Sequence, residues 1–216
     1  MNIHTLCLSI ILILFTINPV SLIGTIVNFP GVNKGKNYNL FFLKLLSYLL
    51  IVQVVFIYLL DKNIFYINFK IEYFWYIIAL VMVPINIGIE ILVGILLIKL
   101  KGKKIGKISF KSKGVINTKK IYIFTLTIGL CEELIFRQTW FNLLKGNMNI
   151  YIIVLVSGIA YGFNHIFIGN KVILQKILIG FIYGLLYVFS GSIIIPIITH
   201  CVENIVVIKR GLKYEN

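Results

Sequence analysis

The segment IYIFTLTIGLCEELIFRQTWFNLL, residues 121–144, is apolar enough to cross a membrane, yet it carries two adjacent carboxylates and an arginine. A membrane-spanning helix needs about 20 mostly apolar residues, and this segment has that length. Ionisable side chains at membrane depth cost about 2.5–3.5 kcal/mol each on insertion scales, so those that occur are candidates for function. The segment therefore predicts a membrane helix that carries part of a functional site.

The composition of the whole chain is typical of a membrane protein. Of its 216 residues 59% are hydrophobic and only 13% are charged, and the mean hydropathy is +0.98. Soluble domains carry about 25% charged residues. We therefore predict an all-α fold, a polytopic transmembrane helical bundle of about seven spans. The expected spans are 3–27, 38–60, 73–98, 121–144, 150–169, 172–190 and 192–208. The last two are short, so they form either a tight hairpin or a pair in which one segment is re-entrant.

The positive charge predicts the orientation of this bundle. The net charge is +14, from 21 Lys and Arg against 7 Asp and Glu. The segment 99–120 holds nine lysines and no acidic residue. Because positively charged loops stay in the cytoplasm, the N-terminus is expected outside and the C-terminus inside. No basic module is left once the spans are removed, so we expect no nucleic-acid partner.

Four parts follow from these patterns. They are N-terminal transmembrane segments without a motif (1–98), a basic cytoplasmic loop (99–120), a transmembrane core with the polar groups (121–208) and a cytoplasmic tail (209–216). The first expected span lacks the basic start and the small-residue cleavage site of a signal peptide, so we expect it to be retained. The three cysteines have no zinc-type spacing and predict no disulfide framework.

The acidic pair at the start of EELIFRQ divides into two roles. Glu133 and Arg137 are four residues apart, so they share one helix face and can form an ion pair. That pair alone is explained equally well by structure or by function. Glu132 is rotated by about 100° from Glu133, so it needs its own partner, a proton, a water molecule or a metal.

Two later spans also carry polar groups. His165 lies in AYGFNHIF, and His200 and Asn204 lie one helical turn apart in IITHCVENIVV. Each histidine alone is more often a packing residue. Buried polar groups, however, must find one another or water. We therefore expect Glu132 to meet His165, His200 and Asn204 in one water-containing cavity among the last four spans.

The three motifs together resemble the CPBP family, the CAAX-processing and bacteriocin-processing intramembrane proteases, also called the Abi family. EELIFR (132–137) matches Glu-Glu-x-x-x-Arg, YGFNH (161–165) matches aromatic-x-x-x-His, and HCVEN (200–204) matches His-x-x-x-Asn. The family usually has Phe where Tyr161 stands, and this change keeps an aromatic ring. The resemblance covers about 121–208.

This resemblance implies an intramembrane endopeptidase, a hydrolase that cleaves a membrane-associated peptide or small protein within the lipid bilayer. The high Ile, Lys and Asn content is typical of an AT-rich bacterial genome, so we expect a bacterial plasma membrane. The implied setting is peptide or bacteriocin maturation, or immunity. By the same resemblance, Glu132 activates the water with His165 beside it, and His200 and Asn204 stabilise the oxyanion or contribute to a metal site. By the same resemblance, Glu133 and Arg137 hold the helix geometry. A non-catalytic immunity scaffold and a peptide transporter remain the alternative functions.

Family members are usually called metalloproteases, which implies zinc or another divalent metal with Glu132, His165 and His200 as ligands. Zinc held by two histidines and a carboxylate lowers the pKa of its water to about 7. A metal-free glutamate mechanism is the alternative, and the chain has no H-E-x-x-H motif. Two acids lie outside the family pattern. Glu203 is either an extra ligand or, as we expect, a residue with a loop-facing or interhelical contact, and we expect Glu90 to pair with Arg137.

Overall fold

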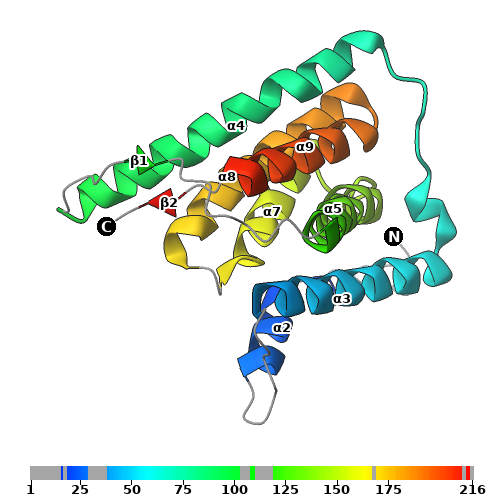
Figure 1. Cartoon of the computed structure of the whole chain (residues 1–216). Helices are drawn as coiled ribbons and strands as arrows, with labels where there is room; N and C mark the ends of the chain where they lie inside the picture. The colour runs from blue at the N-terminus through cyan, green and yellow to red at the C-terminus, as the bar shows by residue number, and fades with distance from the viewer. Residues whose placement is uncertain are drawn as a thin grey trace.

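The computed structural model describes residues 16, 19–28, 38–102, 108–109, 119–166, 169–210 and 213–214, and these residues form a helical bundle (Figure 1). The helices are α2 (Pro19–Asn28), α3 (Tyr38–Leu60), α4 (Tyr73–Leu100), α5 (Lys119–Glu133), α6 (Trp140–Leu144), α7 (Ile150–Phe163), α8 (Asn170–Ser190) and α9 (Ile194–Arg210). A 3₁₀ turn, η1 (Lys62–Phe65), follows α3, and a π-helical segment, η2 (Leu134–Thr139), joins α5 to α6. The two-residue strands β1 (Ile108–Ser109) and β2 (Lys213–Tyr214) pair antiparallel.

These helices follow the predicted spans closely, which confirms the all-helical class. Among the described residues, α4, α8 and the Leu40–Leu60 part of α3 are long and apolar enough to cross a membrane, and α7 is a shorter apolar helix. Most of the expected span 3–27 and most of the basic loop 99–120 lie outside the described residues.

The last two expected spans are separate helices, α8 and α9, joined by a short turn. Gly191 stands at this turn with φ of 66°, and its N–H donates to the carbonyl oxygen of Tyr187. A left-handed residue at a helix C-terminus is usually glycine, because glycine has no Cβ to clash there. Figure 1 shows α8 and α9 side by side, with α4 along one flank of the bundle and α3 along the other.

Close packing of α7 against α8 depends on glycines that repeat every four residues. Gly158 and Gly162 lie on α7, and Gly180 and Gly184 lie on α8. A Cβ on Gly162 would lie 2.8 Å from the backbone nitrogen of Ile177, and a Cβ on Gly180 would lie 2.9 Å from the Cα of Gly158. Small residues at this spacing let membrane helices approach backbone to backbone. The two helices therefore meet at a distance that a larger side chain would not allow.

The π-helical segment η2 departs from the regular helix expected across 121–144. The hydroxyl of Thr139 donates to the carbonyl oxygen of Leu134, five residues earlier, at 3.0 Å. Most of the segment is buried, including the side chain of Arg137. Short π-helical segments are rare and often lie at functional sites.

We predict that Gly162→Ala destabilises the bundle, because the added Cβ meets backbone atoms that cannot rotate away. Overpacking of this kind costs about 1–3 kcal/mol. The thermal unfolding midpoint of the protein in detergent measures the effect. Gly88→Ala on α4 is the matched control, since nothing lies within 4 Å of a Cβ there. It should leave the midpoint unchanged or raise it slightly, and equal midpoints for the two variants would refute the close approach of α7 and α8.

Candidate functional site

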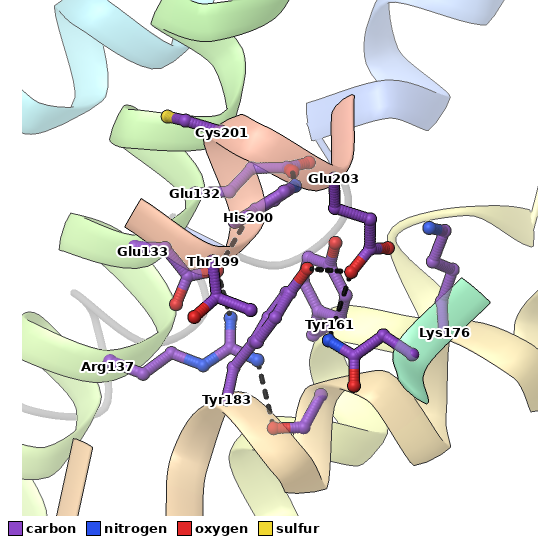
Figure 2. Close-up of polar contacts among 12 residues, drawn as sticks. Glu132, Glu133, Arg137, Tyr161, Lys176, Tyr183, Thr199, His200, Cys201 and Glu203 are labelled. Atoms are coloured by element: carbon purple, nitrogen blue, oxygen red, sulfur yellow. Dashed lines mark hydrogen bonds and ion pairs between the residues drawn. The ribbon is translucent and has the colours of Figure 1, made fainter. Parts of the chain in front are cut away.

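Four motif side chains, those of Glu132, Glu133, Arg137 and His200, gather where α5, η2 and α9 meet beside α8, as Figure 2 shows. Glu132 and Glu133 are the last two residues of α5, and Arg137 lies in η2. His200 projects from α9, which packs against α5. All four side chains are buried, and the exposed fraction of both Glu133 and Arg137 is 0%.

Glu133 lies at the centre of this cluster. Its Oε1 accepts a hydrogen bond from Nη1 of Arg137 at 3.1 Å and lies 2.9 Å from Nδ1 of His200. Nη2 of Arg137 donates to the carbonyl oxygen of Gly180 on α8 at 3.0 Å. The ion pair expected from the spacing is therefore present, and it also ties η2 to both α8 and α9.

Two aromatic rings line the guanidinium group of Arg137. Its Cζ lies 4.7 Å from the ring centroid of Tyr161 and 5.3 Å from that of Tyr183. A cation over a ring face gains about 2 kcal/mol or more when it is desolvated. These contacts lower the cost of burying the charge. Within the described part of the chain, Nε of Arg137 and Oε2 of Glu133 have no hydrogen-bond partner.

Glu132 has partners of its own on two other elements. Its Oε1 accepts a hydrogen bond from Nδ2 of Asn164 at 3.2 Å, and its Oε2 lies 3.8 Å from Nε2 of His200. The imidazole of His200 therefore faces Glu133 with one ring nitrogen and Glu132 with the other. Sequence reasoning missed Asn164, although it directly precedes His165 in the second motif.

His165 follows the C-terminus of α7. Its Nδ1 lies 3.0 Å from the carbonyl oxygen of Tyr161, and the two rings meet edge-on at 5.0 Å. The ring of Tyr161 also meets that of His200 edge-on at 6.1 Å. Tyr161 thus contacts both histidines, but among the described residues His165 makes no hydrogen bond with Glu132.

Asn204 is half-buried and lies on the α9 face that meets α5. A Cβ on Gly129 would lie 3.0 Å from Nδ2 of Asn204 and 3.5 Å from the ring of His200. Gly129 precedes the Glu132–Glu133 pair by one helical turn. The lack of a side chain at Gly129 therefore leaves room for the amide beside the acidic pair.

The donor set matches a metal site only in part. Metal-binding histidines commonly donate their second ring N–H to a carboxylate or a backbone carbonyl. Here Nδ1 of His200 faces Glu133 and Nδ1 of His165 faces a carbonyl oxygen, so Nε2 is the ring nitrogen left to bind a metal, and that of His200 lies 3.8 Å from Oε2 of Glu132. However, across the described ranges no three His, Cys, Asp or Glu side chains are arranged to hold a metal ion.

The two acids outside the motifs have partners from other helices. Oε1 of Glu90 pairs with Nζ of Lys176 at 2.6 Å, so the expected pairing of Glu90 with Arg137 is wrong. The reason is that Glu90 lies on α4, which packs on α8 and so meets Lys176 there. Arg137 in η2 is already paired with Glu133 at the end of α5. Glu203 is buried and makes the expected interhelical contact, through Asn86 of α4 and Tyr183 of α8.

Comparison with known proteins identifies the motif region. Residues 116–206 match the family model described as type II CAAX prenyl endopeptidase Rce1-like. The comparisons with curated proteins and with solved structures found no match. The match covers less than half of the chain, but it includes all six motif residues and the helices that bring them together. It confirms the resemblance to the CPBP and CAAX protease family, and with the long apolar helices it supports an intramembrane protease.

Proposed function

We propose that the protein is an intramembrane endopeptidase that hydrolyses a peptide bond in a membrane-associated peptide or small membrane protein. The observation that carries this proposal is the buried carboxylate of Glu132, placed between the amide of Asn164 and Nε2 of His200. A carboxylate held in a water-poor site is suited to take a proton from a water molecule.

In the proposed reaction Glu132 accepts a proton from a water molecule as the water oxygen attacks the carbonyl carbon. The carbonyl oxygen becomes an oxyanion, and we assign the amide of Asn204, which lies beside Gly129, as the donor of a hydrogen bond to it. One such donor typically contributes about 2.7–4 kcal/mol. The carbon–nitrogen bond then breaks, and the proton held by Glu132 passes to the leaving amine. In this proposal His165 and His200 lie beside the reacting water and substrate, and Glu133 with Arg137 holds His200 in place.

The metal remains a second proposal about the same site. The ligands would be Glu132, His165 and His200, and a bound divalent ion such as zinc would lower the pKa of its water to about 7. Nε2 of His200, which faces the carboxylate of Glu132, supports this proposal, whereas the lack of three converging donors in the described residues speaks against a closed site.

We also propose a bacterial setting of peptide maturation or immunity, with the seven-span orientation expected from the charge. The chain is rich in apolar surface suited to lipid, and its substrate would enter from the bilayer. A non-catalytic immunity scaffold or a peptide transporter is the competing function. A scaffold without catalytic activity would gain nothing from Glu132, because a buried carboxylate lowers the stability of the fold unless a partner compensates its charge.

We predict that Glu132→Gln lowers the rate of peptide cleavage by about 100-fold or more, because an amide cannot take the proton from water. His165→Ala should also remove most of the cleavage. Glu72→Gln is the matched control, since this exposed carboxylate precedes α4 and belongs to none of the three motifs. Cleavage of a candidate precursor peptide by purified protein in lipid vesicles is the measurement. Wild-type rates in the Glu132 and His165 variants would end the protease proposal.

The same preparation tests the metal. If a divalent ion takes part, elemental analysis finds about one ion per chain, and cleavage stops on chelation and returns when zinc is added. Full cleavage by a metal-free preparation would eliminate the metal and leave the glutamate mechanism.

The orientation predicts opposite labelling of two exposed lysine positions. Lys101 follows α4 and is expected inside, whereas Lys145 follows α6 and is expected outside. In a variant without native cysteines, a membrane-impermeant thiol reagent on intact cells should label Lys145→Cys and not Lys101→Cys. The reverse pattern would invert the proposed topology.

A further inference from the structure

Tyr183 connects the proposed site to a second group of buried polar side chains. The ring of Tyr183 stacks on the imidazole of His200, with centroids 5.0 Å apart and planes 25° from parallel. Its hydroxyl donates to Oε2 of Glu203 at 2.8 Å, and the same oxygen accepts from Nδ2 of Asn86 at 3.0 Å. Figure 2 shows the hydroxyl of Tyr183 pointing toward Glu203, away from Arg137.

The three side chains joined by these hydrogen bonds, Tyr183, Glu203 and Asn86, are held in fixed positions. The side chains of Tyr183 and Asn86 are 0% exposed, and that of Glu203 is 1% exposed. The three residues come from α8, α4 and α9, so rotation of any one helix would break a hydrogen bond. The neighbour of His200, Thr199, also donates to the carbonyl oxygen of Ala79 on α4 at 3.2 Å. The position of the Tyr183 ring is therefore set from α4 as well as from α8.

Nothing else in the described residues covers this face of His200 with a parallel ring. Its two nitrogens face Glu133 and Glu132, which fix the imidazole at its edge. The ring can still turn about its Cβ–Cγ bond, because its second edge contact, with Glu132, is 3.8 Å long. A ring stacked on the face removes that motion, because turning would drive the imidazole into the phenol.

We propose that Glu203 and Tyr183 are positioning residues that hold the imidazole of His200 for catalysis, with Asn86 as the anchor on α4. The inference rests on the proposed protease function. Neither residue contacts the reacting atoms, and both act through His200. In this role the side-chain oxygen of residue 203 matters as a hydrogen-bond acceptor for Tyr183, and its charge does not.

Tyr183→Phe keeps the ring and removes the hydroxyl, so the ring loses its anchor. We expect kcat for peptide cleavage to fall by about 3- to 10-fold, the size of one lost hydrogen bond, with KM unchanged within about two-fold. Glu203→Leu should match this loss. Glu203→Gln should keep nearly wild-type kcat, because its amide oxygen can accept from both Tyr183 and Asn86.

Tyr187→Phe is the matched control. It lies one turn beyond Tyr183 on α8 and packs edge-on against Phe141 at 5.0 Å, away from His200. Its kcat should equal that of the wild type. A wild-type kcat in Tyr183→Phe, or a loss in Glu203→Gln as large as in Glu203→Leu, would overturn the proposal.

A readout without catalysis separates this proposal from the protease function. The chain has three histidines, so histidine-labelled protein gives three imidazole signals by NMR, and His200→Gln identifies the one from His200. The ring current of a stacked phenol moves this signal upfield. Tyr183→Leu should move it downfield while leaving the His165 signal in place, and an unmoved signal would overturn the stacking even if peptide cleavage is confirmed. If cleavage fails but the signal moves, only the protease function falls.

Discussion

The carboxylate of Glu133 is the interaction on which the rest of the site depends. One oxygen joins the guanidinium of Arg137 to the imidazole of His200, and Arg137 reaches on to the backbone of α8. Three separate helical elements are therefore held by one buried charge cluster. Without it, the imidazole of His200 would lose the 2.9 Å contact of its Nδ1 with Glu133, the residue next to Glu132.

Burying such a charge cluster in a membrane costs free energy, so its presence needs an explanation other than stability. Replacing a buried ion pair by apolar side chains is often neutral or stabilising by about 1–4 kcal/mol. Stability alone therefore does not account for Glu133 and Arg137 at the centre of an apolar helix bundle. The cluster is better explained by what it positions, namely an imidazole held between two carboxylates with an aromatic ring on its face.

The site also requires that its helices approach each other closely. The glycines of α7 and α8 bring Tyr161 and Tyr183 together, with ring centroids 6.4 Å apart, and both rings contact Arg137. Gly129 leaves the corresponding space for Asn204 between α5 and α9. Small residues thus decide where the backbones lie, and the charged and aromatic residues then fill the remaining space. The packing of the helices therefore also determines the geometry of the site.

Sequence reasoning located the helices well, because the length of an apolar run between polar segments limits a membrane helix. The expected 38–60 matches α3, and 73–98 lies within α4. It also paired Glu133 with Arg137, since both lie on one helix. It failed for Glu90, whose partner Lys176 depends on which helices are neighbours and how each is rotated. Asn164 and Tyr183 were missed because their contacts also depend on which helices are neighbours. The π-helical segment η2 was missed because hydrophobic periodicity does not reveal a local change in hydrogen bonding.

The free energy of unfolding, measured for a double-mutant cycle at Glu133 and Arg137, tests the central claim most directly. Arg137→Met alone leaves a buried carboxylate without its cation and should cost about 3–5 kcal/mol. Adding Glu133→Leu removes that carboxylate, so the double variant should be more stable than Arg137→Met alone. Strictly additive losses in the two single variants would contradict the claim that this charge cluster holds the helices together.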